Sequence, residues 1–313
     1  MPELPEVETV KRILAPQLCG RRIERVNIKN AQVIAHPDAE RFADLLTGKT
    51  ITGMGRRGKF LRVELADGSC LCLHLRMTGR LLVTPTDFPE EKHTHLIAEL
   101  SGGKQLRYID VRRFGRFWYL KKDETDVFTG MSQLGIEPDD PLLTADYLRT
   151  KIANKKKAIK EMLHDQSIVA GIGNIYSDEI LFDAAIYPEK KCCELTADEW
   201  NRLAESIPKT IAWGIETDAM TPEEYLAGKG KEYRNTPDLK AYGSAGKPCV
   251  RCGTVMERIT VGGRSSCFCP ACQRMYKLNQ CFVENVSSEA FSFLARQNDR
   301  KFPMVELTFK NHT

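Results

Sequence analysis

The sequence predicts a multidomain protein of the α+β class, in which an N-terminal β-sandwich with a leading helix precedes a helical domain and a small C-terminal zinc finger with a β-hairpin. Short apolar or alternating runs separated by turns dominate residues 20–121, whereas apolar residues have helical spacing from 131 to 226. Two Cys-x-x-Cys pairs then follow close together. The 313 residues are enough for two or three such modules.

The first module, residues 1–121, begins as a helix and continues as strands. Apolar residues of the stretch 3–15 have helical spacing, and Pro2 and Pro5 suit a first helical turn, where a missing N–H is harmless. Runs at 60–65 and 70–75 flank the turn Ala66-Asp67-Gly68 and predict a hairpin. Further strands are expected at 93–100, 105–111 and 116–121. These runs predict the sandwich behind the leading helix.

A charged, apolar-poor stretch at 121–129 indicates a linker to the second module, residues 131–227. Helices are expected there at 143–152, 156–165, 174–184 and 196–216. Residues 228–247 are rich in Gly, Lys and Pro and predict a loop, residues 248–276 hold the cysteine pairs, and residues 277–313 form a C-terminal extension of unknown role.

Composition excludes several classes of protein. With 42% hydrophobic and 28% charged residues the chain is neither disordered nor fibrous, and no stretch is apolar enough for a membrane span. The N-terminus lacks a signal-peptide pattern and the 11 cysteines are an odd number, so we expect a soluble cytoplasmic protein with reduced thiols. The net charge of +4 permits a nucleic-acid partner without requiring one. No strong sign of an oligomer is present, and we expect a monomer.

The two Cys-x-x-Cys pairs supply four thiolates at the spacing of a structural zinc site. The four residues are Cys249, Cys252, Cys269 and Cys272, with sixteen residues between the pairs. The alternative, two redox motifs, lacks the βαβ context that such motifs need. We therefore predict one structural Zn²⁺ ion held by these four residues, and we expect that Cys267 is not a ligand.

Arg264 lies beside the Gly262-Gly263 turn of a predicted hairpin whose base the metal would hold. A rigidly presented arginine suits a phosphate or a developing anion. From the hairpin alone, an arginine that is simply solvated in a turn is an equally good interpretation.

A second candidate anion site is the turn Gly171-Ile172-Gly173-Asn174. Its glycines permit a tight turn, Asn174 can cap the next helix, and outward-facing backbone N–H groups would bind a phosphate. Upstream lysines predict a basic surface suited to a nucleic-acid backbone. They are Lys151, Lys155, Lys156, Lys157 and Lys160. Both patterns are also typical of ordinary helix–helix turns and solvated helix faces.

Lys59 follows the basic turn Arg56-Arg57-Gly58 and is a candidate general acid or electrostatic stabiliser, although a lysine in a turn is more often solvated. Met77, Arg112 and Phe114 lie at ends of predicted strands, where apolar and cationic side chains can enter a base stack. Their pattern alone favours core positions for Met77 and Phe114.

Pro2 is the most informative residue. Removal of Met1 would leave a secondary amine, and an α-amino group has a pKa of about 8, so a fraction is neutral and nucleophilic at neutral pH. Attack on a sugar C1′ would give an iminium electron sink, and Glu3 beside it can move protons. The alternative is that Pro2 and Glu3 only begin a helix.

Together these pieces resemble the bacterial formamidopyrimidine-DNA glycosylase family over about residues 1–276. The matching stretches are MPELPEVETV at the start, GRRGKF at 55–60, HLRMTG at 74–79, EKHTH at 91–95, IDVRRFG at 109–115, GIGNIYSDE at 171–179 and GGRSSCFCPACQR at 262–274. The resemblance implies a helix–two-turn–helix DNA-binding domain at 131–227, a lesion-recognition loop at 228–247 and a zinc finger at 248–276. It also implies excision of oxidised purines such as 8-oxoguanine and formamidopyrimidines from double-stranded damaged DNA, followed by β,δ-elimination at the abasic site.

The family's residue roles carry over to the matching positions. Pro2 is implied as the Schiff-base nucleophile and Glu3 as its acid–base partner, and Lys59 and Arg264 as the proton donors of β- and δ-elimination. Met77, Arg112 and Phe114 would fill the gap left by the flipped nucleotide, which reverses the core interpretation of Met77 and Phe114. Contacts to the DNA backbone are implied for His93, Arg112, Lys155 and Asn174.

Three features depart from the family pattern. Arg76 stands where a glycine is expected, the loop after Gly228 follows the family only loosely, and the tail after residue 276 has no family counterpart. One alternative is a related enzyme for oxidised pyrimidines, which the N-terminal LPEVE and the set around Met77 disfavour. Another is a non-catalytic, zinc-dependent DNA-binding protein, which the full set of catalytic residue types disfavours. We expect a nucleoid-associated enzyme of bacterial base excision repair with no organic cofactor.

Overall fold

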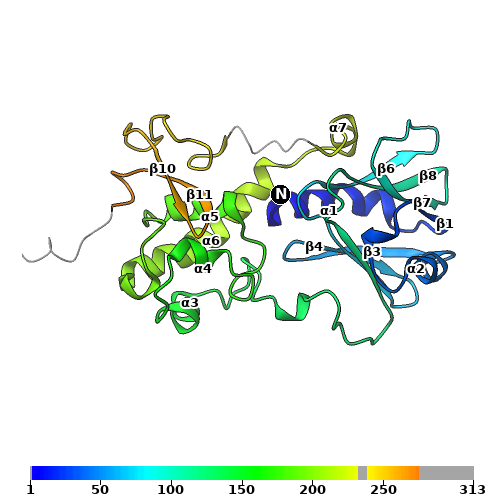
Figure 1. The fold of residues 1–313 in the computed structure, drawn as a ribbon, viewed down its shortest axis with the longest axis horizontal. Coiled ribbons are helices and arrows are strands. Elements are labelled where there is room, and N and C mark those ends of the chain that lie inside the picture. The colour runs from blue at the N-terminus through cyan, green and yellow to red at the C-terminus, as the bar shows by residue number, and fades with distance from the viewer. Residues whose placement is uncertain (1, 232–237, 275–313) are drawn as a thin grey trace, which may run out of the picture. The chain divides into compact units, whose positions relative to one another are not determined.

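The computed structural model describes residues 2–231 and 238–274, which Figure 1 shows as a ribbon. The expected extension at 277–313 and the centre of the expected loop, residues 232–237, lie outside the described residues. No helix within the described ranges is long and apolar enough to cross a membrane.

Two sheets form the N-terminal sandwich. The first has the strand order β1-β7-β8-β6, which are Ile23–Ile28, Thr94–Leu100, Lys104–Asp110 and Gly79–Pro85. The second has the order β2-β9-β5-β4-β3, which are Ile34–His36, Arg116–Leu120, Cys70–His74, Phe60–Leu65 and Ile51–Arg57. The predicted hairpin is present, with Phe60 paired to His74 and Glu64 paired to Cys70. Alternating apolar residues of both sheets share one buried cluster, as the predicted sandwich requires.

Helix α1 (Leu4–Leu18) contributes to two hydrophobic cores. Val7, Val10 and Leu14 belong to the buried cluster of the sandwich, whereas Leu4 belongs to the buried cluster of the helical domain. The helix begins where the backbone N–H of Glu3 donates to Glu6 Oε2 at 2.7 Å. The start of the chain therefore lies where the two cores meet.

The helical domain is built around the long helix α6. Its helices are α3 (Ala145–Ile152), α4 (Ile159–Leu163), α5 (Asn174–Asp183), α6 (Ala197–Thr217) and α7 (Pro222–Ala227). Thr196 and Glu199 form a capping box at the start of α6, and Trp200 and Leu203 of its apolar face are buried. Helix α6 also contacts α1, which ties the helical domain to the first helix of the chain.

One helix of the sandwich was not expected from the sequence. Helix α2 (Ala39–Leu46) begins at Asp38, which accepts a hydrogen bond from the Arg41 N–H, and buries Phe42 and Leu46. Short 3₁₀ turns lie at Ala31–Val33, Met131–Gln133 and Cys192–Glu194.

The predicted hairpin of the cysteine module is also present. Strands β10 (Glu257–Val261) and β11 (Arg264–Phe268) pair antiparallel, with Val261 opposite Arg264, so Gly262 and Gly263 form the turn. Arg264 is the first residue of the returning strand.

Candidate active site

A pocket of about 570 Å³, here called the central pocket, draws its lining from the sandwich, the helical domain and the hairpin. It brings together five residues that the sequence singled out: Glu3, Lys59, Met77, Asn174 and Arg264. These residues are up to 261 positions apart in the chain, so only the fold assembles them. Pro2 is buried directly before Glu3 but does not itself line the central pocket of the described chain.

The Glu3 carboxylate is held by the N-terminus of helix α5. Its Oε2 accepts the backbone N–H groups of Gly173 at 2.8 Å and Tyr176 at 3.1 Å, and its Oε1 accepts that of Ile175 at 2.8 Å. Only 2% of Glu3 is exposed. Burial raises the pKa of Glu3 to about 7, against the lowering effects of Lys59 and of the amide donors. At neutral pH the carboxyl group therefore exists in both protonation states.

The expectation of a phosphate site at residues 171–174 is therefore corrected by the structure. The amide groups at this helix start point to Glu3 instead of outward, because the N-terminal segment of the chain occupies the place of an external anion. A Cβ on Gly173 would lie 2.4 Å from Glu3 Cδ, so only glycine allows this approach. Asn174 is the first residue of α5 and Gly173 its N-cap, so Asn174 is not the cap that we expected.

Lys59 is buried, with only 8% of its surface exposed, and is not the solvated turn lysine that its local pattern favoured. Its Nζ donates a hydrogen bond to the backbone carbonyl of Ile172 at 2.9 Å. Burial lowers the pKa of Lys59, while the nearby Glu3 carboxyl opposes this shift. Lys59 and Glu3 therefore face one cavity with pKa values displaced toward each other, an arrangement that suits proton transfer.

Arg264 is exposed at the tip of a hairpin that a buried ion pair attaches to the helical domain. Asp178 accepts hydrogen bonds from Ser266 Oγ at 2.6 Å and from the Cys267 N–H at 3.0 Å. Lys160 Nζ donates to Asp178 at 2.6 Å and to the Ser265 carbonyl at 2.9 Å. The expectation that Lys160 belongs to a basic surface was wrong, because its side chain is 1% exposed and pairs with Asp178.

Four cysteines form the expected metal site. The sulfur atoms of Cys249, Cys252, Cys269 and Cys272 lie within 4.8 Å of one another, and three of the S···S distances are 3.5, 3.5 and 4.0 Å. Four thiolates at the ~2.3 Å Zn–S distance of a tetrahedral site would be ~3.8 Å apart, so the group fits one structural Zn²⁺ ion. Cys267 lies outside this group, as expected.

The three expected wedge residues lie on two loops at one edge of the sandwich. Met77 and Phe114 are 41% and 47% exposed, so the core positions that their pattern favoured were wrong. The Arg112 guanidinium lies over the Phe114 ring, 4.6 Å from its centre. Asp110 holds the Phe114 loop by accepting the N–H groups of Arg112 at 3.1 Å and Gly115 at 3.0 Å.

The remaining predicted contacts lie at the surface around these loops and on the helical domain. Lys155 is exposed, and His93 is partly exposed with a backbone φ of +69°. Asn174 Oδ1 is buried and has no hydrogen-bond partner within the described chain, so this side chain is available to a ligand of the central pocket.

Sequence reasoning missed several residues of the central pocket, among them His74, His164 and Tyr242. Burial, helped by nearby cations, lowers the pKa of His74 and of His164 to about 3, so both rings are neutral at physiological pH. Tyr242 is placed by Glu179, which accepts the N–H groups of three consecutive residues up to Tyr242 at 2.8 to 3.0 Å. His74 and Glu179 do lie in the family-matching stretches 74–79 and 171–179, whereas His164 and Tyr242 lie outside every matching stretch and carry no local signal.

A four-cysteine group, a pocket lined by a buried glutamate and a buried lysine, and exposed apolar side chains on nearby loops are features expected of a DNA glycosylase of base excision repair. Family models support this class over most of the chain. Residues 1–117 match the "Formamidopyrimidine-DNA glycosylase N-terminal domain", residues 134–225 the "Formamidopyrimidine-DNA glycosylase H2TH domain" and residues 246–274 the "Zinc finger found in FPG and IleRS". The chain belongs to the formamidopyrimidine-DNA glycosylase family.

Individual relatives agree with this assignment. The formamidopyrimidine-DNA glycosylase of Moorella thermoacetica is 46% identical over 259 residues, which are 83% of this chain and 94% of that protein. That of Pelotomaculum thermopropionicum is 42% identical over 88% of this chain and all of its own length. The solved structure of Lactococcus lactis FPG with FAPY-dG-containing DNA superposes with a TM-score of 0.80 at 36% identity, covering 87% of this chain and 100% of that one.

Proposed function

We propose that the protein is a bifunctional DNA glycosylase and abasic-site lyase that removes 8-oxoguanine and formamidopyrimidines from duplex DNA and nicks the abasic strand by β,δ-elimination. The observation that carries this proposal is that Glu3, Lys59 and Arg264 all line the central pocket. Pro2, which is buried, directly precedes Glu3 in the chain. The FAPY-dG DNA bound by the Lactococcus lactis relative supports the purine class of lesion.

Pro2, freed as a secondary amine after removal of Met1, attacks C1′ of the damaged nucleotide, and the bond from C1′ to the base breaks as the base leaves with a proton. The attached nitrogen then loses its own proton, and the C1′–O4′ bond breaks with protonation of O4′, which leaves an iminium that joins the protein to the opened sugar. Glu3 holds or releases protons beside this centre, for which its pKa of about 7 is suited. Three amide donors keep the Glu3 carboxyl group in place throughout.

Two cationic groups then assist strand cleavage. β-Elimination removes a proton from C2′, which ionised Glu3 accepts, and breaks the C3′–O bond, whose leaving phosphate takes a proton from the buried Lys59 ammonium. Arg264, on the hairpin held by Asp178, stabilises the second leaving phosphate in δ-elimination. Cys249, Cys252, Cys269 and Cys272 would hold one Zn²⁺ ion in a closed site of the structural type, which would stabilise the module that carries Arg264.

Met77, Arg112 and Phe114 fill the space that the flipped nucleotide leaves in the duplex. Base extrusion costs a few kcal/mol, part of which such wedges offset, and their exposure makes them available for this role. We assign backbone contacts to His93, Arg112, Lys155 and Asn174, which orient the DNA without selecting the lesion. We further propose that a single copy of the chain acts on one duplex.

A second candidate substrate is an oxidised pyrimidine. Another structure of the Lactococcus lactis enzyme contains DNA with an oxidised pyrimidine, at 36% identity and a TM-score of 0.80. Arg76 also lines the central pocket, where a longer side chain changes the space next to the lesion.

Borohydride trapping tests the catalytic proposal. The wild-type protein should form a covalent adduct with duplex DNA that contains an abasic site, and Pro2→Gly should form none. Glu3→Gln should retain DNA binding but lose base release from 8-oxoguanine duplexes. The absence of an adduct from wild-type protein that lacks Met1 by mass spectrometry would support a non-catalytic DNA-binding protein instead. A panel of 8-oxoguanine, formamidopyrimidine and thymine glycol duplexes decides the lesion class.

A further inference from the structure

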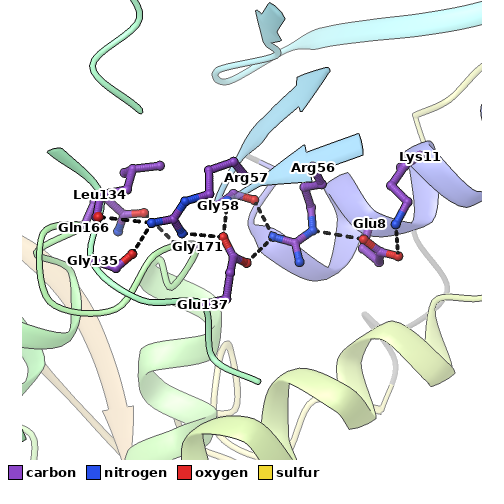
Figure 2. Close-up of polar contacts among 10 residues, drawn as sticks. All are labelled: Glu8, Lys11, Arg56, Arg57, Gly58, Leu134, Gly135, Glu137, Gln166 and Gly171. Carbon is purple, nitrogen blue, oxygen red and sulfur yellow. Dashed lines mark hydrogen bonds and ion pairs between the residues drawn. The ribbon is translucent and has the colours of Figure 1, made fainter. Parts of the chain in front are cut away.

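Glu137 lies before helix α3 in the helical domain, and its side chain lies between two arginines of strand β3 (Figure 2). Glu137 Oε2 accepts a hydrogen bond from Arg56 Nη1 at 2.6 Å, and Oε1 accepts one from Arg57 Nη1 at 2.6 Å. Oε1 also accepts the backbone N–H of Gly58 at 2.7 Å. One carboxylate thereby holds three consecutive residues at the turn from β3 to β4.

The next residue of that turn is Lys59. Its ammonium group bonds to the Ile172 carbonyl, and its backbone follows directly on the Gly58 N–H that Glu137 holds. Gly58 has a φ of +52°, and a Cβ there would lie 3.3 Å from both Leu134 and Ala170 side-chain atoms. The turn is therefore packed closely against the helical side of the molecule, and its Gly58 N–H donates to the Glu137 carboxylate.

The charge of Glu137 matters as well as its position. Burial alone would raise the pKa of Glu137, but Arg56, the Gly58 N–H and Arg57 together hold it below its usual value. The side chain of Arg56 is 11% exposed, and its Nε also donates to Glu8 Oε2 of α1 at 3.0 Å. Figure 2 draws this contact beside the one to Glu137. An ionised Glu137 thus balances two cations immediately before Lys59 in the chain.

We propose that Glu137 is a positioning residue for β-elimination, which fixes the turn through Gly58 and so places the Lys59 ammonium in the central pocket. This inference rests on the proposed role of Lys59 as proton donor. Glu137 does not line the pocket within the described chain, so it acts through its neighbours. A displacement of a reacting group by about 1 Å can slow a step by about 100-fold. The effect should therefore fall on the rate of strand nicking and leave DNA affinity unchanged.

Three variants of the full-length zinc-loaded protein test this role. Glu137→Gln removes the charge and keeps an oxygen for the Gly58 N–H, whereas Glu137→Asp keeps the charge on a shorter side chain. The matched control is Glu199→Gln, because Glu199 likewise accepts bonds from a cation, Lys190, at 2.7 Å and from a backbone N–H, that of Thr196, at 2.8 Å. Glu199 lies at the start of α6 and is not a lining residue of the central pocket.

Four quantities are measured for each variant: Tm, Kd for a duplex with an abasic site, the single-turnover rate of base release from an 8-oxoguanine duplex, and the single-turnover rate of nicking at a pre-formed abasic site. We expect Glu137→Gln and Glu137→Asp to slow nicking by about 10- to 100-fold, with Kd and base release within twofold of wild type. Glu199→Gln should lower Tm without this selective loss.

Two results would overturn the inference. One is a wild-type nicking rate in both Glu137 variants. The other is an equal fall of Tm, base release and nicking, the signature of a general structural defect that Glu199→Gln would share. Failure of the proposed function itself is distinguishable, since wild-type protein would then give no borohydride adduct and no nicking at all.

Discussion

Replacement of Asp178 by asparagine should both destabilise the protein and release the hairpin that carries Arg264. The change removes the charge that balances Lys160, whose side chain is 1% exposed and 2.6 Å from Asp178. Breaking a buried ion pair by removal of one partner costs about 3–5 kcal/mol. A chain of this size loses about 2–4 °C of Tm per kcal/mol, so Tm should fall by about 6–20 °C.

The same variant should alter the products of cleavage. Asp178 accepts hydrogen bonds from Ser266 Oγ and the Cys267 N–H, so its loss frees the strand that begins with Arg264. On a sequencing gel, DNA nicked by β-elimination alone should accumulate at the expense of the β,δ-product. The double variant Lys160→Met with Asp178→Leu removes both charges and should recover most of the lost Tm but not the δ-product. An unchanged Tm together with a normal product ratio in Asp178→Asn would refute this account of the hairpin.

Three further predictions follow from the site. Burial raises the pKa of Glu3 to about 7, so the wild-type free energy of unfolding should fall by about 3 kcal/mol relative to Glu3→Gln as pH rises from about 4.5 to about 7. Urea titrations of both proteins at pH 5 and pH 8 check the sign. An equal change in the free energy of unfolding of the two proteins between these pH values would count against the shift. Chelation of zinc should release one ion per chain and abolish nicking while the helical circular-dichroism signal largely persists, since the four cysteines of the metal site lie outside both large cores. Met77→Ala should leave the free energy of unfolding within about 0.5 kcal/mol of wild type but slow base excision, because Met77 is 41% exposed; a loss of stability typical of a core residue would contradict the wedge role.

Local patterns predicted the local structure well. The hairpin 60–75, the Gly262-Gly263 turn and the four-cysteine group each depend on neighbours a few positions away, and all are present. Helix α2 was not predicted, because only two residues after its Asp38 cap, Phe42 and Leu46, are buried, which is too few to give a clear helical pattern of apolar residues.

Partners that come from distant parts of the chain could not be predicted. The amide groups at the start of α5 look available for phosphate until Glu3 is placed there, and Lys160 looks solvated until Asp178 pairs with it. Glu137 and Asp110 are ordinary acids in the sequence, and their importance comes from the turns they hold. The motif resemblance corrected Met77 and Phe114, which the apolar pattern alone assigned to the core.

The attachment of Glu3 to α5 spans 170 residues, and this has a consequence for synthesis on the ribosome. Glu3 is translated well before the amides that hold it and before the β11 strand that presents Arg264. A nascent chain therefore cannot hold the Glu3 carboxylate in its final place until residues up to Tyr176 have emerged from the ribosome. The central pocket becomes complete later still, when the β10–β11 hairpin with Arg264 has emerged.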